Sequence, residues 1–275
     1  MNKKVDTSRK LHELIKILHN LGSLVVAFSG GTDSTFLLKV AKDALDDRVI
    51  AATGLSATYP DEEYQEARKI VKILGVKHVI VDTEELSSPQ FCSNPPDRCY
   101  YCKKELFEKL KEVALRENIA HIADGSNLDD MSDFRPGILA AREMGVVSPL
   151  KDAKLSKNEI RSLSRKMNLA TWDKPSFACL ASRFPYQEKI DLKKLQMVIE
   201  AESFLGKTLN TRQLRVRHHF PIARIEIPEN KIGQFADKDL RDRVINKLNE
   251  IGYIYITLDL AGFRSGSMNE VLKKI

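Results

Sequence analysis

The sequence predicts an α/β protein whose parallel sheet is covered by helices on both faces, followed by a smaller α+β domain. Through the first two-thirds of the chain, short apolar runs alternate with segments whose apolar residues recur at helical spacing. Such alternation is typical of βα units, in which ligands bind at the carboxyl ends of the parallel strands. A turn rich in glycine and hydroxyl side chains follows the first apolar run, where a ligand site of this kind is expected.

The elements expected in the first part of the chain alternate in type. An entry helix over residues 11–21 precedes a strand over 24–28 and a helix over 34–44. The later elements are strands over 49–55, 78–81, 121–123 and 146–147, and helices over 61–74, 103–118, 138–144 and 157–167. Gly75 marks the end of one of these helices, and Ser156 is the expected N-cap of the last one.

The pattern changes after about residue 185. Here we expect helices over 191–205 and 238–251 and strands over 213–217, 223–227 and 253–258, with a hairpin turn through 218–221 that contains His218 and His219. We place the boundary near residue 188, which divides the chain into domains of residues 1–188 and 189–275.

The composition is that of an ordinary globular protein, because 43% of the 275 residues are hydrophobic and 30% are charged. The formal net charge is +6, and the charges are dispersed along the chain. This balance favours anionic partners such as nucleotides, phosphates or RNA, but it is not the concentrated basic patch of a dedicated nucleic-acid binder. The sequence shows neither a signal peptide nor an apolar stretch of membrane-spanning length, so we expect a cytoplasmic protein without membrane contact. The four cysteines are then not expected to form stable disulfides.

The glycine-rich turn, SGGTDS at residues 29–34, joins the first strand to the next helix. The N–H groups and dipole at the N-terminus of a helix attract anions, so a phosphate chain is expected here. The lysine of the kinase-type phosphate loop does not occur in this turn. The alternative is a glycine turn that only allows the helix to pack against the strand.

Cys99 and Cys102 form a C-x-x-C pair just before the helix expected over 103–118. Such a pair serves as a redox pair, as half of a zinc site or as part of an iron–sulfur site. A zinc site needs two further Cys or His ligands at close spacing, and none is obvious in the nearby sequence. The distant Cys179 would complete a set of three thiolates, which suits a cubane cluster with one open iron. The alternative, which we favour for Cys92, is that these are small buried side chains.

The SGGTDS turn resembles the PP-loop of the ATP pyrophosphatases, a group that includes GMP and NAD synthetases, argininosuccinate synthetase and tRNA thiolases. The resemblance implies a PP-loop (adenine nucleotide alpha hydrolase-like) domain over residues 1–188, in which ATP is cleaved between its α and β phosphates. Its pyrophosphate would be cradled by Ser29, Gly30, Gly31, Thr32 and Ser34. Asp33 would hold Mg²⁺ or orient the loop.

The segment SFACLASRFPY at residues 176–186 resembles the cysteine-bearing signature of the LarE family, ATP-dependent sulfur transferases of nickel-pincer cofactor synthesis. Matching segments continue in order along the chain: DGSNLDD at 124–130, DFRPG at 133–137, RVR at 215–217, IARIE at 222–226 and LDLAGFRSG at 258–266. The resemblance implies that ATP adenylates a carboxylate of pyridinium-3,5-biscarboxylic acid mononucleotide, and that a sulfur nucleophile displaces AMP to leave a thiocarboxylate. Gln187 departs from the pattern, because glycine is expected there.

The resemblance also bears on the source of the sulfur. In family members with a single cysteine, the residue that Cys179 matches gives up its own sulfur. Here Cys99 and Cys102 are also present, as in members that resemble cluster-dependent tRNA thiolases with a 4Fe-4S cluster. We therefore predict that Cys99, Cys102 and the catalytic Cys179 hold such a cluster, with sulfide from a donor on the open iron as the nucleophile.

Further site residues are predicted around this chemistry. Gly125 lies at the end of a strand and is expected to contact the nucleotide. Arg215 and Arg217 share one strand face and would clamp a phosphate or carboxylate of the substrate, while Arg183, beside Cys179, would contact the adenylate or the substrate. Asp129, Asp130 and Asp133 are candidate Mg²⁺ contacts. For each group, the alternative is a solvated surface or a structural ion pair.

Other functions compete with the sulfur transferase. A tRNA 2-thiolase combines the same loop with three cysteines, although it needs a strong basic face for RNA. An ammonia-using amidoligase would leave the SRFPY segment without a role, and the non-enzymatic alternative is a zinc-stabilised nucleotide-binding module. We expect a homo-oligomer, with the 189–275 domain binding substrate or forming subunit contacts.

Overall fold

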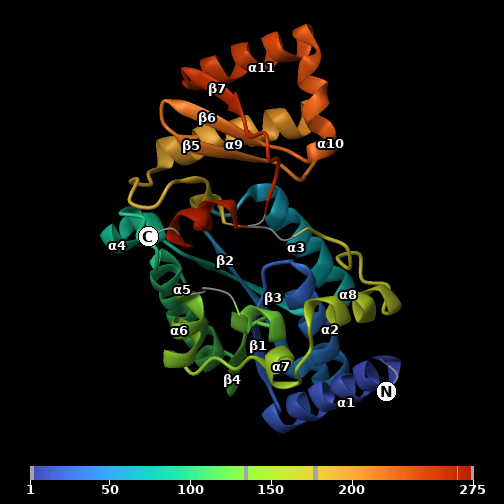
Figure 1. Ribbon diagram of the computed structural model, residues 1–275. Coiled ribbons are helices and arrows are strands. Elements are labelled where there is room, and N and C mark those ends of the chain that lie inside the picture. The colour runs from blue at the N-terminus through green and yellow to red at the C-terminus, as the bar shows by residue number, and fades with distance from the viewer. Residues whose placement is uncertain (1–2, 133–135, 176–178, 265, 274–275) are drawn as a thin grey trace. The chain divides into compact units, whose positions relative to one another are not determined.

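The computed structural model describes residues 3–132, 136–175, 179–264 and 266–273 (Figure 1). The chain divides into two compact units: Met1–Glu85 with Asp97–Phe177, and Leu86–Pro96 with Ala178–Ile275. The functional division at residue 188 stays a prediction. Asp133 and the SFA part of the cysteine signature lie outside the described residues.

The first unit is built on a parallel sheet with the strand order β3-β2-β1-β4. These strands are β1 (Leu24–Ala27), β2 (Val49–Leu55), β3 (Lys77–Asp82) and β4 (His121–Ala123). Val25 in the middle of β1 lies opposite Ile50 on one side and Ile122 on the other. The predicted parallel sheet is therefore confirmed.

Helices connect and cover these strands (Figure 1). They are α1 (Lys3–Leu21), α2 (Thr32–Leu45), α3 (Asp61–Leu74), α5 (Arg98–Arg116), α6 (Pro136–Glu143), α7 (Pro149–Asp152) and α8 (Lys157–Lys166). Ser156 begins α8 with a capping box to Glu159, and Gly75 ends α3 in the left-handed conformation. Among the described residues, every helix is too short or too polar to span a bilayer.

The two faces of this sheet are buried separately, because successive side chains of a strand point in opposite directions. Leu24 and Val26 of β1 pack in a core with α1, α2 and α8. Val25 packs in a second core with α5 and α6. Burial on both faces explains why β1 is a continuous apolar run.

The second unit contains a three-stranded sheet in the order β5-β6-β7. Its elements are α4 (Pro89–Cys92), α9 (Leu192–Thr208), β5 (Arg215–His219), β6 (Ile222–Glu226), α10 (Glu229–Ile232), α11 (Lys238–Ile251) and β7 (Tyr255–Leu258). β5 and β6 are antiparallel, and β7 runs parallel to β6. Val216, Ala223 and Ile225 face a core that α9 and α11 complete, which leaves the charged side chains of β5 and β6 on the opposite face.

Residues 86–96 belong to this second unit through contacts with residues 184–190. Asn94 is fully buried, and its Nδ2 donates a hydrogen bond to the Pro185 carbonyl at 2.6 Å. The amide of Gln187 donates to the Asn94 carbonyl at 2.9 Å. Gln187 has a φ of 70°, a conformation that glycine adopts more easily, which explains why glycine suits this position.

Three local predictions differ from the structure. α5 begins at Arg98 with Asp97 as its N-cap residue, so the prediction that Cys99 and Cys102 precede the helix is wrong. The Tyr100 N–H already donates to the Asp97 carbonyl at 2.8 Å, so the first turn includes Cys99. The strand expected over 146–147 is reduced to a single bridge from Val147 to β4. His218 and His219 belong to β5 and not to the turn, since the pairing with β6 continues to His219.

Candidate active site

The loop between β1 and α2 turns at two glycines. Gly30 has a φ of 66°, and Gly31 is the N-cap residue of α2. A Cβ on Gly30 would lie 3.1 Å from the Cβ of Ala67, so the loop packs closely against α3. The first N–H groups of a helix have no partner inside the helix, which makes this loop suitable for an anion.

The hydroxyl groups of the loop contact protein groups. Ser34 Oγ donates to the Gly31 carbonyl at 3.2 Å and lies 3.2 Å from Ser29 Oγ. Thr32 Oγ1 donates to the carbonyl of Thr171 at 2.7 Å, which connects the loop to the segment after α8. The serine contacts hold the loop to itself, and the Thr32 contact holds it to a distant segment.

Asp33 is half-buried in the first turn of α2. One carboxylate oxygen, Oδ2, accepts a hydrogen bond from Asn127 Nδ2 at 3.3 Å, whereas Oδ1 is buried and has no hydrogen-bond partner among the described residues. Burial raises the pKa of Asp33, and the charge of Lys157 opposes that shift. A carboxylate oxygen of this kind is a suitable Mg²⁺ ligand.

The loop after β4 lies against the start of α2. A Cβ on Gly125 would be 3.1 Å from the backbone nitrogen of Ser34, so the contact leaves no room for a side chain. Asp124 accepts hydrogen bonds from Ser126 Oγ at 2.7 Å and Ser148 Oγ at 2.8 Å. The two loops therefore meet at the carboxyl edge of the sheet, as the sequence predicts for a ligand site.

Side chains from two other segments also hold the PP-loop. The Tyr59 hydroxyl donates to the Ser29 carbonyl at 2.9 Å. Lys174 Nζ donates to the Gly30 carbonyl at 3.2 Å and forms ion pairs with Glu63 at 2.7 Å and Glu66 at 3.0 Å. The loop is thus connected both to α3 and to the segment that follows α8.

The cysteines lie in different units. Cys99 and Cys102 are three residues apart in α5, so their side chains share one helix face, and Cys99 is exposed. Cys179 is exposed and is the N-cap residue of a 3₁₀ turn, η4 (Leu180–Arg183), in the second unit. Cys92 is half-buried, and its Sγ contacts the Leu86 carbonyl at 3.1 Å.

The donor chemistry of these cysteines suits soft metals. Thiolates are the usual ligands of iron–sulfur clusters, and an exposed Cys99 on the same helix face as Cys102 allows both to bind one cluster. Within the described residues, no three Cys, His, Asp or Glu side chains are grouped to hold a metal ion. The three-cysteine cluster therefore stays a prediction.

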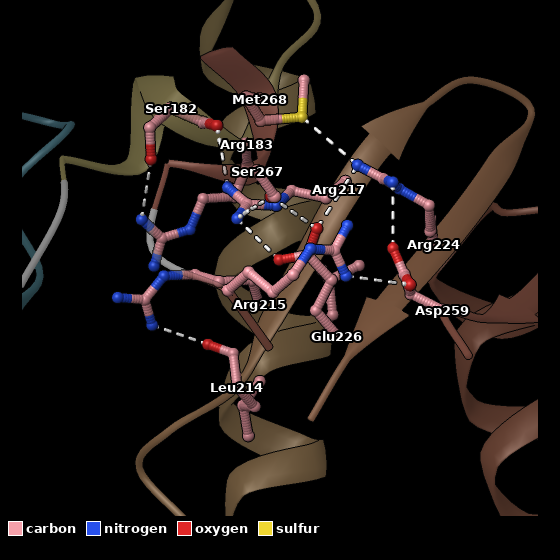
Figure 2. Close-up of polar contacts among 12 residues, drawn as sticks. Ser182, Arg183, Leu214, Arg215, Arg217, Arg224, Glu226, Asp259, Ser267 and Met268 are labelled. Carbon is pink, nitrogen blue, oxygen red and sulfur yellow. Dashed lines mark hydrogen bonds and ion pairs between the residues drawn. The ribbon is translucent and has the colours of Figure 1, made fainter. Parts of the chain in front are cut away.

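The second unit contains a cluster of buried arginines at the charged face of its sheet: Arg183, Arg215 and Arg217 (Figure 2). Arg217 donates to Glu226 at 2.6 Å, to Ser267 Oγ at 2.9 Å and to the Ser182 carbonyl at 3.0 Å. On β6, Arg224 forms an ion pair with Asp259 at 3.0 Å. Two strands and the residues beside Cys179 are joined through these contacts.

Arg183 and Arg215 belong to the same cluster (Figure 2). Arg183 is fully buried and makes a two-point contact with Glu202, from Nε at 2.9 Å and from Nη2 at 2.8 Å. Its Nη1 also donates to the Cys179 carbonyl at 3.1 Å. Burial and the nearby charge of Arg183 lower the pKa of Arg215 to about 10. A bound anion would offset the positive charge gathered here.

His218, in contrast, is a core residue. It is fully buried, with Nδ1 3.0 Å from the Tyr253 hydroxyl and with Phe184 and Phe220 beside its ring. Burial, together with the charge of Lys194, lowers the pKa of His218 to about 4. The neutral imidazole thus serves packing and not ligand binding.

The structure brings together Asp33, Gly125 and the PP-loop in one unit, and Cys179, Arg183, Arg215 and Arg217 in the other. The sequence assigned no role to Asn127, which lies in the matched segment 124–130, and did not indicate Lys174 or Glu202. Glu202 carried no clear signal, since this part of α9 also contains Glu200 and Ser203. Lys174 carried none, because its partners are distant in sequence.

Known proteins resemble this chain to different extents. The profile of the NAD synthase family matches residues 7–94. An argininosuccinate synthase of Psychrobacter sp. is 24% identical over 189 residues, which are 63% of this chain and 44% of that protein. An uncharacterized protein of Synechocystis sp. is 41% identical over 265 residues, covering 96% of this chain and 98% of its relative.

A pyridinium-3,5-bisthiocarboxylic acid mononucleotide synthase of Lactiplantibacillus plantarum is 38% identical over 262 residues. The alignment covers 95% of this chain and 94% of the synthase, so it includes both compact units. Together with the PP-loop and the parallel sheet, this similarity shows that the chain belongs to the LarE family of PP-loop proteins.

Proposed function

We propose that this protein is an ATP-dependent sulfur transferase that converts a carboxylate of pyridinium-3,5-biscarboxylic acid mononucleotide into a thiocarboxylate. The observation that carries the proposal is the similarity to the L. plantarum synthase along nearly the whole chain. The ordered anion loop of the first unit and the arginine cluster beside Cys179 support it.

In the first step, a substrate carboxylate oxygen attacks the α phosphorus of ATP and pyrophosphate leaves. The backbone N–H groups of Gly30, Gly31 and Thr32, with Ser29 and Ser34, bind the leaving pyrophosphate. Asp33, whose Oδ1 is buried without a hydrogen-bond partner among the described residues, would hold Mg²⁺, and Asn127 orients the carboxylate through its hydrogen bond to Oδ2. Gly125 allows the β4 loop to approach the nucleotide.

In the second step, a sulfide nucleophile attacks the acyl adenylate, the bond to AMP breaks, and the thiocarboxylate forms. A carboxylate is a poor acyl donor, whereas AMP is a good leaving group, so adenylation makes this exchange feasible. Cys99, Cys102 and Cys179 would hold a 4Fe-4S cluster, and the chemistry it would supply is a bound sulfide for this attack. Arg183 holds the backbone at Cys179, and Arg215 and Arg217 bind an anionic group of the substrate.

The test measures pyrophosphate release from ATP with two candidate substrates. The pyridinium dicarboxylate mononucleotide should stimulate release, and the product should contain one sulfur for each carboxylate converted. Stimulation by tRNA and not by the mononucleotide would overturn the proposal and support a tRNA 2-thiolase.

Anaerobic cluster reconstitution tests the source of the sulfur. Bound iron and sulfide together with a visible absorption band are expected, with repeated turnovers when sulfide is supplied. An iron-free protein that loses hydrogen sulfide from Cys179 in a single turnover would refute the cluster and retain the family reaction.

A further inference from the structure

Two consecutive carbonyl groups of the PP-loop are held by side chains from outside the loop. Tyr59 donates to the Ser29 carbonyl at 2.9 Å, and Lys174 donates to the Gly30 carbonyl at 3.2 Å. Burial, with Glu63 and Glu66 nearby, raises the pKa of Tyr59, so its hydroxyl keeps the proton that it donates. These carbonyls belong to the peptides between residues 29 and 31, just before α2 begins at Thr32.

Because the peptide group is planar, a contact that holds a carbonyl also fixes the direction of the N–H group in the same peptide. In a planar trans peptide the C=O and the following N–H point in opposite directions. Fixing the carbonyls of Ser29 and Gly30 therefore directs the N–H groups of Gly30 and Gly31 away from Tyr59 and Lys174. Gly30 has a φ of 66°, in the left-handed region, and Gly31 is extended, with a φ of −79° and a ψ of 169°, so the chain turns at Gly30 directly before the N-terminus of α2.

The charge of Lys174 is largely neutralised by its own neighbours. Its side chain is 11% exposed and lies 2.7 Å from Glu63 and 3.0 Å from Glu66. Both glutamates belong to α3, which also contacts Gly30 through Ala67. A lysine paired with two carboxylates is a weak ligand for a further anion but a strong donor to a carbonyl.

We propose that Lys174 and Tyr59 are positioning residues that fix the Gly30 and Gly31 amides toward the pyrophosphate half of ATP. The inference rests on the proposed ATP cleavage. Lys174 acts through the backbone and does not bind the phosphates itself. The AMP half of the nucleotide is outside its influence.

The test compares the binding of magnesium pyrophosphate and of AMP by calorimetry. Lys174→Met should weaken pyrophosphate binding about tenfold, because an anchoring hydrogen bond from a charged donor is lost, and should leave AMP binding unchanged. Tyr59→Phe, which removes one hydroxyl group, should act in the same direction with a smaller effect. Lys39→Met is the matched control, since Lys39 pairs only with Asp43 on the surface of α2 among the contacts described here.

Glu63→Gln tests whether Lys174 positions the loop or binds phosphate directly, because the two roles predict different changes in pyrophosphate affinity. If Lys174 positions the loop, weakening its ion pair leaves pyrophosphate binding unchanged or weaker. Tighter binding in Glu63→Gln would mean that the released lysine binds phosphate, and it would overturn the inference.

The remaining outcomes are also decisive. Wild-type pyrophosphate affinity in both Lys174→Met and Tyr59→Phe would overturn the inference, as would an equal loss of AMP binding. If the wild-type protein binds neither ATP nor pyrophosphate, the proposed function itself fails.

Discussion

Removing the charge of Glu202 should destabilise the second unit strongly. Glu202 makes the two-point contact with Arg183, whose side chain is 0% exposed, and it also accepts the backbone N–H of Val216 at 2.8 Å. Glu202→Gln preserves the size of the side chain and one acceptor oxygen. The main change is therefore a buried guanidinium without its counter-charge.

The magnitude follows from the burial of the pair. Removing one partner of a buried ion pair typically costs about 3–5 kcal/mol. We expect about 3 kcal/mol for Glu202→Gln, because glutamine can still accept the Val216 amide. In the double variant Arg183→Met with Glu202→Met, Arg183 no longer leaves an uncompensated buried charge. The loss should therefore be about 2 kcal/mol smaller than the sum of the losses in the single variants Arg183→Met and Glu202→Met.

The assay is urea unfolding followed by circular dichroism, with midpoints converted to free energies of unfolding. Glu250→Gln is the matched control, since Glu250 pairs with Lys247 on the exposed surface of α11 and should contribute less than about 1 kcal/mol. Equal losses in Glu202→Gln and Glu250→Gln, or fully additive losses in the double variant, would refute the reasoning.

Three further predictions concern protons, magnesium and iron. His218 has a pKa of about 4 in the folded protein and about 6.5 in the unfolded chain, so the unfolded chain takes up the proton first as the pH falls. The free energy of unfolding therefore decreases by about 3 kcal/mol between about pH 6.5 and pH 4. His218→Gln should show a flatter pH dependence of the urea midpoint, and identical slopes would contradict this. Asp33→Asn should lower Mg²⁺-dependent pyrophosphate formation by at least about a hundredfold, and an unchanged rate would argue against a magnesium role. Because burial raises the pKa of Asp33, the activity of the wild-type protein should fall as the pH drops through that raised value. After anaerobic reconstitution, Cys99→Ser should bind less iron per chain than Cys92→Ser, and equal iron contents would exclude Cys99 as a ligand.

The sequence predicted the parts of the fold that depend on local pattern. The apolar run before Ser29 specifies a strand buried on both faces, and the glycines after it specify a turn into a helix, so the PP-loop and the sheet around it could be expected. The placement of Gly125 beside this loop also follows from topology, because the carboxyl ends of neighbouring parallel strands meet at one edge.

Contacts between distant segments could not be obtained in this way. Lys174 bonds to a carbonyl 144 residues away, and the bond from Asn94 to Pro185 spans 91 residues. Neither contact has a periodic or capping signal, since each depends on tertiary packing. The early start of α5 was missed because the charged residues after Cys102 dominated the helical pattern, whereas the helix begins at Arg98 after the N-cap residue Asp97.

Residues 86–96 are synthesised early but belong to the second unit, and this affects the order in which the chain can fold during synthesis. Domains generally fold from the N-terminus as the chain emerges. Asn94 is made early, but its partners at Pro185 and Gln187 emerge only after the C-terminal half of the first unit has been synthesised. Until then the segment around Asn94 lacks its contacts with Pro185 and Gln187, so in a ribosome-bound fragment ending before residue 184 it should be cleaved more readily by proteases than in the full chain.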